Sequence, residues 1–512
     1  MPEGRPPGRP FLLRGFYGAG RRRVLQKRYY LNMDAPKHSS AYRFRRALNW
    51  VPLGFAYAFL YMGRYNLTVS KSVLGDALMT KAQFGEIFAV GAWVYALSFL
   101  ITGPLTDKMG GRVAMLVGTA GAMFANFLMG LTLYGITFWG WNVSIATSFL
   151  FLYALNMHFQ SYGAISIVTV KAPWFHVRER GTFSTIFGAM IAFGLYFAFD
   201  WGFALAEATR ATAGEAPSVM ARVFAAVFGL GGAGVDQNWW IFFAPAAILG
   251  AFWLIMFFFL RNTPGEAGYQ DFDTGEDSVS DTGERLPIKK VFLKIITHPV
   301  LLVVCGIEFC SGILRNGIMH WYPLFAAEVG FKKGFWITDN WGLMLLLTGL
   351  AGSFLTGWCS DKLFQSRRGP MAAILYGVMG ASAGVMALTL GANIWWAGIA
   401  TMLISMSVTG VHGILSGTST TDFGGAKNAG AATGIVDGMV YLGTGFQSIV
   451  IGHITPVGEL AKDPSNWKLW PVFLVPFAVI GFFLSVKIWN ALPKKSRRPA
   501  AVPAEPEYQP GS

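Results

Sequence analysis

The stretch "GPLTDKMGGR", residues 103–112, joins two apolar segments, and much of its pattern occurs a second time. In the second half of the chain, "GWCSDKLFQSRRG", residues 357–369, again places Asp-Lys four residues after a glycine, with basic residues behind it. The two aspartates, Asp107 and Asp361, lie 254 residues apart. A recurrence at this distance predicts a chain built from two similar halves.

The sequence around these two turns is strongly apolar. Of the 512 residues, 53% are hydrophobic and 13% are charged, whereas a typical soluble domain carries about 25% charge. Apolar stretches of about twenty residues, long enough for a helix to cross a bilayer, recur along the chain. We therefore predict an all-α membrane protein with twelve transmembrane helices in two pseudo-symmetric six-helix bundles. The expected spans are 47–69, 83–105, 112–135, 143–168, 181–205, 238–260, 299–326, 339–358, 370–391, 394–418, 428–452 and 469–491.

Positive charge is unevenly distributed between the connecting segments. The two tails and the loops on their side of the membrane hold 31 of the 41 Lys and Arg residues, and the opposite loops hold eight. Because basic loops stay in the cytoplasm, this asymmetry predicts that both termini are cytoplasmic. Within the first tail, Met33 is a candidate start of the native chain. The expected parts are a basic tail (1–46), a first bundle (47–260), an acidic linker with a short amphipathic helix (261–298), a second bundle (299–491) and a second tail (492–512).

Two arginines interrupt the apolar spans. Arg64 is the single charge in "LNWVPLGFAYAFLYMGRYNLTV", residues 48–69, and Arg315 lies 251 residues further on, in "ILRNGIMHWYP", residues 313–323. An uncovered guanidinium at a helix centre costs about 2.5–3.5 kcal/mol or more. At equivalent positions in two halves, the pair is expected to face a central site. A guanidinium group is permanently charged and can donate two parallel hydrogen bonds, so the pair can bind a phosphorylated small molecule or inorganic phosphate.

A different reading gives each arginine a buried acid as its structural partner. Glu308 lies two turns before Arg315 on the same helix face, and Asp437 and Asp200 also lie within spans. Two arginines at repeat-equivalent positions favour ligand binding over this reading. Glu308 is a candidate substrate contact, and Glu308 and Asp437 are the candidates for carrying a coupled proton. We interpret three span histidines as packing residues: His158, His412 and His453.

Further side chains can complete the site. Tyr57, Tyr61 and Tyr95 can donate hydrogen bonds to phosphate or sugar oxygens, and Gln160 is a polar residue within a span. We find no Walker loop, zinc-protease motif, nucleophile elbow or Rossmann glycine run, so we expect neither an enzyme nor a cofactor or metal site. The basic residues lack interleaved aromatic residues, which argues against nucleic acid as a partner. We expect a monomer in contact with membrane lipid.

The first turn carries a family resemblance. It matches Gly-x-Leu-x-Asp-Lys-x-Gly-x-Arg at Gly103, Leu105, Asp107, Lys108, Gly110 and Arg112, and in this pattern and position the chain resembles the major facilitator superfamily. The resemblance implies a cytoplasmic latch that must open during alternating access. It assigns this gating role to the motif residues, together with Asp361 and Lys362 in the second half.

Within that superfamily, about 45–490 of the chain is most similar to the organophosphate:inorganic phosphate antiporters. The similarity lies in "FAYAFLYMGRYNL", "ILRNGIMHWYP" and "GWCSDKLF". It implies a bacterial inner-membrane transporter that exchanges a sugar phosphate or glycerol 3-phosphate for inorganic phosphate by a rocker-switch mechanism, with Arg64 and Arg315 as the phosphate site. Two alternatives stay open: a sugar-phosphate receptor of the same fold, and a proton-coupled organic-anion symporter.

Overall fold

The chain folds into long helices, and no strand occurs in the part that the structure describes. This computed structural model describes residues 38–176, 179, 188–190, 192–210, 217–231, 234–272, 274, 290, 292–293, 297–330, 335–364, 367–415 and 429–491, with side chains of the last range from 434. Most of the expected linker helix and both tails beyond these limits lie outside the described residues.

The first half contains the membrane-length helices α2, α3, α4, α5 and α9, together with a segment that ends in a π-helical turn and α7. Their bounds are α2 Ser40–Leu74, α3 Lys81–Met109, α4 Gly111–Trp139, α5 Ile145–Trp174, the π-helical turn Phe197–Trp201, α7 Gly202–Ala208, α8 Val219–Phe228 and α9 Trp240–Phe259. Helix α3 begins in a capping box, in which Thr80 and Gln83 satisfy each other's backbone N–H groups.

The second half repeats this arrangement. Its helices are α11 Pro299–Met319, α12 Trp321–Val329, α13 Trp336–Asp339, α14 Trp341–Lys362, α15 Arg368–Thr389, α16 Ile394–Ile414, α18 Ala429–Ile454 and α19 Leu469–Lys487. The expected seventh span is therefore two consecutive helices that meet at His320. Short 3₁₀ turns occupy Gly75–Ala77, Gly265–Ala267, Gly458–Lys462 and Pro464–Lys468.

Ten helices in the described part are long and apolar enough to cross a membrane. Helices α2 and α5, which we also predicted as spans, are 35 and 30 residues long but are not among the ten. Both bury polar side chains inside the protein, including Arg64 and Lys71 on α2 and Asn156 and Gln160 on α5. Their length fits a crossing, and their polarity is hidden from lipid by neighbouring helices.

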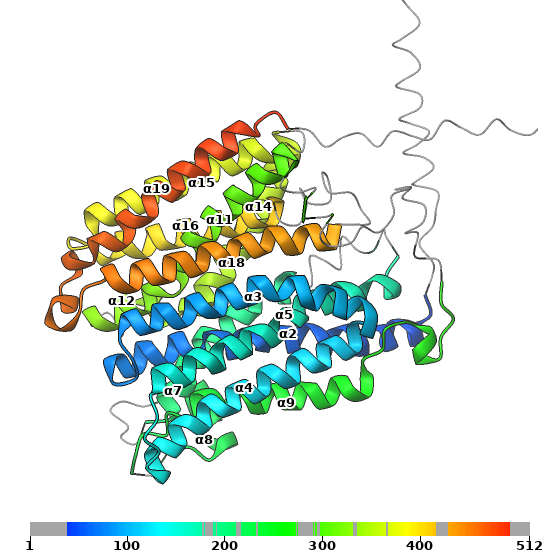
Figure 1. Cartoon of the computed structure of the whole chain (residues 1–512), viewed down its shortest axis with the longest axis horizontal. Coiled ribbons are helices and arrows are strands. Elements are labelled where there is room, and N and C mark those ends of the chain that lie inside the picture. The colour runs from blue at the N-terminus through cyan, green and yellow to red at the C-terminus, as the bar shows by residue number, and fades with distance from the viewer. Residues whose placement is uncertain are drawn as a thin grey trace, which may run out of the picture.

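The helices lie side by side in two groups, one from each half of the chain (Figure 1). Helices α4, α5 and α9 pack with α2 and α3, whereas α15, α16 and α19 pack with α11 and α14. Helices α3 and α18 form the main contact between the groups. We call the end where α2 begins and α19 ends the N/C end, and the opposite end the far end.

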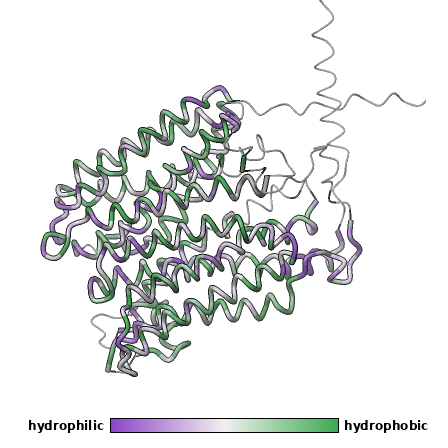
Figure 2. Tube along the Cα trace, in the orientation of Figure 1, coloured by the Kyte–Doolittle hydropathy of each residue, from purple (hydrophilic) through white to green (hydrophobic). Residues whose placement is uncertain are grey.

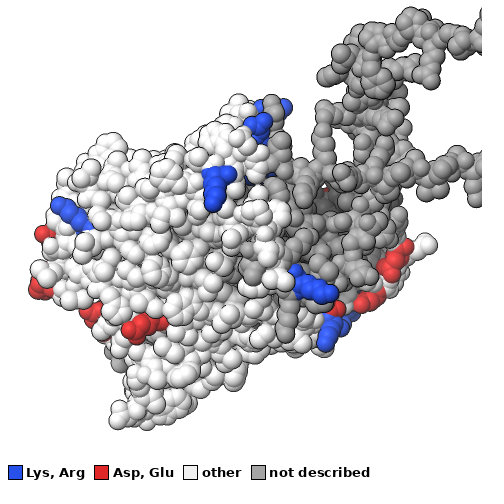
Figure 3. Space-filling model, turned by 45° about the horizontal axis from the view of Figure 1, so that its top comes forward, with Lys and Arg blue, Asp and Glu red and all other residues white. Residues whose placement is uncertain are grey.

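Apolar residues run along the helices, and hydrophilic residues concentrate at their ends (Figure 2). The space-filling view agrees: most charged side chains on the visible face gather toward the two ends, and a broad band between them is uncharged (Figure 3). Large apolar side chains such as Phe151, Phe354 and Leu388 are exposed on the helix surfaces. This distribution fits a protein whose middle is surrounded by lipid.

At the far end the two halves are held together. Lys81 of α3 donates to Glu328 of α12 over 2.9 Å, and its side chain is only 1% exposed. Asp200 of the first half accepts hydrogen bonds from the backbone N–H groups of Gly342 and Leu343, at 2.6 and 3.0 Å, at the beginning of α14. These contacts close the far end between the halves.

Glycines let α3 and α18 approach closely at the far end. A Cβ atom at Gly452 would lie 2.8 Å from the carbonyl oxygen of Lys81, and one at Gly85 would overlap the carbonyl oxygen of Ser448. Toward the N/C end the contact loosens, because a Cβ at Gly434 would stay 3.9 Å from the side chain of Phe99. The two helices therefore diverge from the far end toward the N/C end.

Candidate functional site

Arg64 lies in the second half of α2, ten residues before its end, and is 1% exposed. Its Nε donates to the side-chain oxygen of Gln160 and its Nη1 to the hydroxyl of Tyr441, both over 2.9 Å. The rings of Tyr61 and Tyr95 lie 4.9 and 4.8 Å from its Cζ. Its Nη2 is buried and has no hydrogen-bond partner. The guanidinium is thus held on two sides by neutral groups and keeps one donor unused.

A chain of amides fixes the position of Gln160. Gln160 donates to Asn156 over 3.0 Å, and Asn126 donates to the same oxygen over 3.2 Å. Asn66 in turn donates to Asn126 over 2.6 Å, linking the chain back to α2. Because these side chains carry no charge, the network orients Arg64 without neutralising it.

Arg315 lies on α11 in the second half and is half-buried. It makes no hydrogen bond or ion pair with any residue that the structure describes. The phenol groups of Tyr61, Tyr65 and Tyr441 lie near both Arg315 and Arg64, and Arg64 is close enough to Arg315 for the two positive charges to repel each other. The two guanidinium groups therefore belong to one polar cluster between the halves.

We call this group the arginine–tyrosine cluster, and it contains most of the predicted substrate contacts. The ring of Tyr57 lies 5.7 Å from that of Tyr61, and the ring of Tyr95 lies 4.2 Å from that of Tyr441. Its members are Arg64, Arg315, Tyr57, Tyr61, Tyr65, Tyr95, Gln160 and Tyr441. The sequence analysis missed two of them. Tyr65 directly follows Arg64, and Tyr441 approaches from α18, a contact that spacing along the chain cannot reveal.

The acids considered as partners of the arginines have other contacts. Asp200 caps α14, and Glu308 is 0% exposed and contacts Nδ1 of His412 on α16 through one carboxylate oxygen, at 3.3 Å. Asp437, which is half-buried on α18, acts electrostatically on His412. Among the described residues, neither Arg64 nor Arg315 forms an ion pair. Glu308 therefore contacts a histidine that the sequence analysis had treated as packing.

Gly110 makes the turn between α3 and α4 at the N/C end. Its φ of +80° is a left-handed conformation that glycine adopts without strain. Two residues later, the backbone N–H of Arg112 donates to Asn262, and its guanidinium donates to the carbonyl oxygen of Phe257, both over 2.8 Å. Arg112 thereby ties this turn to the end of α9 and the residues that follow it.

The other predicted gating residues lie at the same end. Asp107 and Lys108 are exposed, and Asp107 makes no hydrogen bond or ion pair within the described part of the chain. In the second half, Lys362 is exposed and Asp361 accepts from Arg368 over 3.1 Å. Gly103, on the same helix as Asp107, has open space where a Cβ would stand, with Ile165 at 3.9 Å. Residues 416–428, which precede α18, lie outside the described residues.

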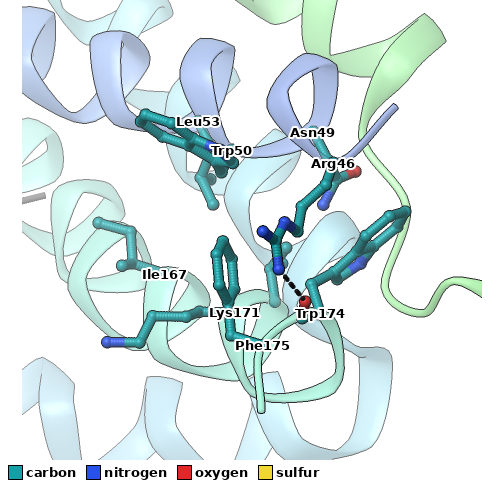
Figure 4. A pocket seen from close by; sticks show the side chains of 9 residues that line it. Arg46, Asn49, Trp50, Leu53, Ile167, Lys171, Trp174 and Phe175 are labelled. Carbon is teal, nitrogen blue, oxygen red and sulfur yellow. Dashed lines mark hydrogen bonds between the residues drawn. The ribbon is translucent and has the colours of Figure 1, made fainter. Parts of the chain in front are cut away.

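A separate small pocket lies between the N/C ends of α2 and α5 (Figure 4). Arg46 points into it but is fully engaged: it contacts Glu179 at 3.0 Å and the carbonyl oxygen of Trp174 at 3.5 Å, and it lies 4.5 Å from the ring of Phe175. This pocket is distinct from the arginine–tyrosine cluster, and the guanidinium group of Arg46 has partners within it. The described residues contain no group of three or more His, Cys, Asp or Glu side chains placed to hold a metal ion.

Several known proteins are similar to this chain in sequence. Residues 53–448 match the family model described as Major Facilitator Superfamily. The chain is 23% identical to a "Probable hexose phosphate transport protein" of Chlamydia pneumoniae, over 90% of this chain and 94% of that one. It is 23% identical to a "Glycerol-3-phosphate transporter" of Bacillus subtilis (90% and 95%), and 24% identical to a "Membrane sensor protein UhpC" of Salmonella typhimurium (90% and 94%).

The fold also matches solved structures. A bacterial homologue of the human lysosomal transporter Spinster, in an inward-facing and unoccupied conformation, aligns with a TM-score of 0.65 at 15% identity. The alignment covers 88% of this chain and 98% of that one. At this identity the likeness shows the fold alone.

Proposed function

Because the chain belongs to the major facilitator superfamily, and is thus a membrane transporter and not an enzyme, we propose that it exchanges an organophosphate for inorganic phosphate across its membrane. The organophosphate is a sugar phosphate or glycerol 3-phosphate, as the names of its relatives suggest. We assign the binding site to the arginine–tyrosine cluster.

The observation that carries this proposal is that neither arginine has a negatively charged partner among the described residues. A buried cation is normally paired, because removing it from water costs several kcal/mol. Arg64 has only neutral partners and one unused donor, and Arg315 has no partner among the described residues. A phosphate dianion would supply the missing charge and accept forked hydrogen bonds from both sides. Tyr61, Tyr65 and Tyr441 lie where they can bind its remaining oxygens.

The same charges favour exchange over one-way transport. When the site is empty, the two guanidinium groups repel each other at low dielectric. Enclosing them without an anion is therefore unfavourable, and the empty protein changes conformation slowly. One phosphate then leaves only as another enters.

Alternating access would use the asymmetry between the two ends. The Lys81–Glu328 pair and the Asp200 cap close the far end, and the divergence of α3 and α18 leaves the halves further apart toward the N/C end. In the opposite state the far-end contacts would break, and the motif residues around Asp107 would latch the N/C end. Lys108, Arg112, Asp361 and Lys362 belong to this proposed latch.

We also propose the orientation and the domain division predicted from the sequence. The excess of Lys and Arg in the tails and the loops on their side supports a cytoplasmic N/C end. The named bacterial relatives favour a bacterial inner membrane. For the two bundles we propose the bounds 47–260 and 299–491, and the packing of α2 to α9 and of α11 to α19 into two groups supports them.

Exchange of labelled phosphate in proteoliposomes tests the function. Wild-type protein should exchange internal phosphate for external glucose 6-phosphate or glycerol 3-phosphate. Arg64→Lys and Arg315→Lys should each lose this exchange, because lysine keeps the positive charge but cannot donate the two parallel hydrogen bonds of a guanidinium group. Arg222→Lys, at an exposed position on α8, is the control and should be fully active. Full exchange by either core variant would contradict the assigned site.

A second candidate is a phosphate-ester sensor, which the similarity to a membrane sensor favours. A sensor would bind the ester without moving it. Binding of glucose 6-phosphate to purified protein, combined with no exchange in proteoliposomes that hold correctly folded protein, would support the sensor over the transporter.

A further inference from the structure

Glu308 and His412 form a buried acid–imidazole pair that phosphate binding does not require. One oxygen of Glu308 lies 3.3 Å from Nδ1 of His412, and its other oxygen is buried without a hydrogen-bond partner. Glu308 is 0% exposed, whereas the side chain of His412 is 32% exposed. His412 thus lies between the buried carboxylate and solvent-accessible space, on the last turn of α16 at the N/C end.

We propose that the Glu308–His412 pair is a proton-binding site coupled to the anion at the arginine–tyrosine cluster. This inference rests on the proposed function. The pair is uncharged overall when it holds one proton, as a carboxylic acid beside neutral imidazole or as a carboxylate beside imidazolium. Without that proton, an isolated carboxylate would remain in the interior, which is costly. The proton can pass between water and Glu308 through His412.

The groups around the pair determine when the proton binds. Arg315 follows Glu308 by seven residues on α11, about 10 Å along the helix axis. Asp437 of α18 also acts on His412, and its negative charge favours protonation of the pair. Tyr376 of α15 and Cys305 on α11 itself lie close enough to Glu308 to be affected by its charge. Arg315 is the permanent cation near the pair, and its positive charge opposes protonation.

A bound dianion reverses this opposition. When a phosphate ester neutralises Arg64 and Arg315, their repulsion of the proton disappears. At an effective dielectric constant of about 20, one unit charge at this distance changes a proton affinity by about tenfold. Anion binding therefore raises the proton affinity of the pair, and by reciprocity the proton raises the affinity for the anion. The protein carries a proton together with the phosphate dianion.

Calorimetry of glucose 6-phosphate binding to the purified full chain tests this coupling. The binding enthalpy, measured at pH 7 in buffers of different ionisation enthalpy, gives the number of protons taken up with each ligand. The ligand contributes equally in all variants. Wild type should take up more protons per bound ligand than Glu308→Gln. Its affinity for glucose 6-phosphate should weaken by up to tenfold for each pH unit above the pH at which the pair loses its proton, whereas the affinity of the variant should depend less on pH.

His412→Asn provides a second test that leaves the carboxylate in place, in case Glu308→Gln does not fold. It should likewise lower the proton uptake below that of wild type. His453→Asn, at an exposed histidine near the far end of α18, is the matched control and should take up as many protons as wild type.

Equal proton uptake by wild type, Glu308→Gln and His412→Asn, all of which bind the ester, overturns the coupling while leaving the phosphate site intact. No ester binding by folded wild type overturns the phosphate site and the coupling together. These two failures are therefore distinguishable.

Discussion

Replacing Gly452 with alanine should shift the protein away from the conformation described here. The new Cβ would lie 2.8 Å from the carbonyl oxygen of Lys81, whereas ordinary contacts begin at 3.4 Å. Helices α3 and α18 would have to separate by about 0.6 Å, and over-packing of this kind typically costs about 1–3 kcal/mol. The cost falls only on the state with a closed far end. The ratio of far-end-closed to far-end-open molecules should therefore fall by about 5-fold to 160-fold.

Spin-label distances at the two ends measure this shift. Labels at Val219 and Leu460 report on the far end, and labels at Phe44 and Leu363 report on the N/C end; all four side chains are well exposed. In Gly452→Ala the far-end distance should lengthen and the N/C-end distance should shorten. The control is Gly384→Ala, because a Cβ at Gly384 meets no atom within 4 Å. Unchanged distances at both ends in Gly452→Ala would show that this contact does not hold the far end closed.

Three other substitutions test separate parts of the structure. Tyr441→Phe leaves Nη1 of Arg64 without a hydrogen-bond partner, which costs about 1–3 kcal/mol. The unfolding temperature in detergent should therefore fall, and added phosphate should restore part of the loss. A variant as stable as wild type would argue against this hydrogen bond. Lys81→Met removes the hydrogen bond to Glu328, a charge-assisted contact that contributes about 1.5–3 kcal/mol. The spin-label distance at the far end should therefore lengthen. An unchanged distance would show that this contact does not hold the far end closed. Gly110→Ala places an alanine at φ +80° and ψ 152°, a conformation that only glycine adopts readily and that costs about 1–3 kcal/mol. The variant should have a lower unfolding temperature and an unchanged affinity for phosphate. An unchanged unfolding temperature would refute the strain.

Much of the fold could be predicted because lipid imposes a simple pattern on a sequence. Ten helices combine length with apolarity, and the Asp-Lys turns mark equivalent points in the two halves. Helices α2 and α5 were also predicted as spans, although they carry more polar residues, which face other helices and not lipid. The pattern did not predict the break at His320, where the chain passes from α11 to α12 within one expected span.

The site could be predicted only in part. Arg64 and Arg315 stand out because a charge inside an apolar span needs an explanation. Tyr441 and His412 carry no such signal: each reaches its partner across more than a hundred residues of chain, and aromatic residues are common throughout this sequence. The glycine contact between α3 and α18 is equally hidden, since it depends on how two helices cross in space.

The polarity of α2 and α5 has a consequence for how the chain is made. An arginine at a helix centre disfavours entry from the translocon by about 2.5–3.5 kcal/mol, so α2 gains little from inserting alone. Its guanidinium finds an acceptor in Gln160, which emerges from the ribosome 96 residues later. The first crossing to be synthesised is thus among the least self-sufficient, and its stable residence in the bilayer depends on the arrival of the fourth.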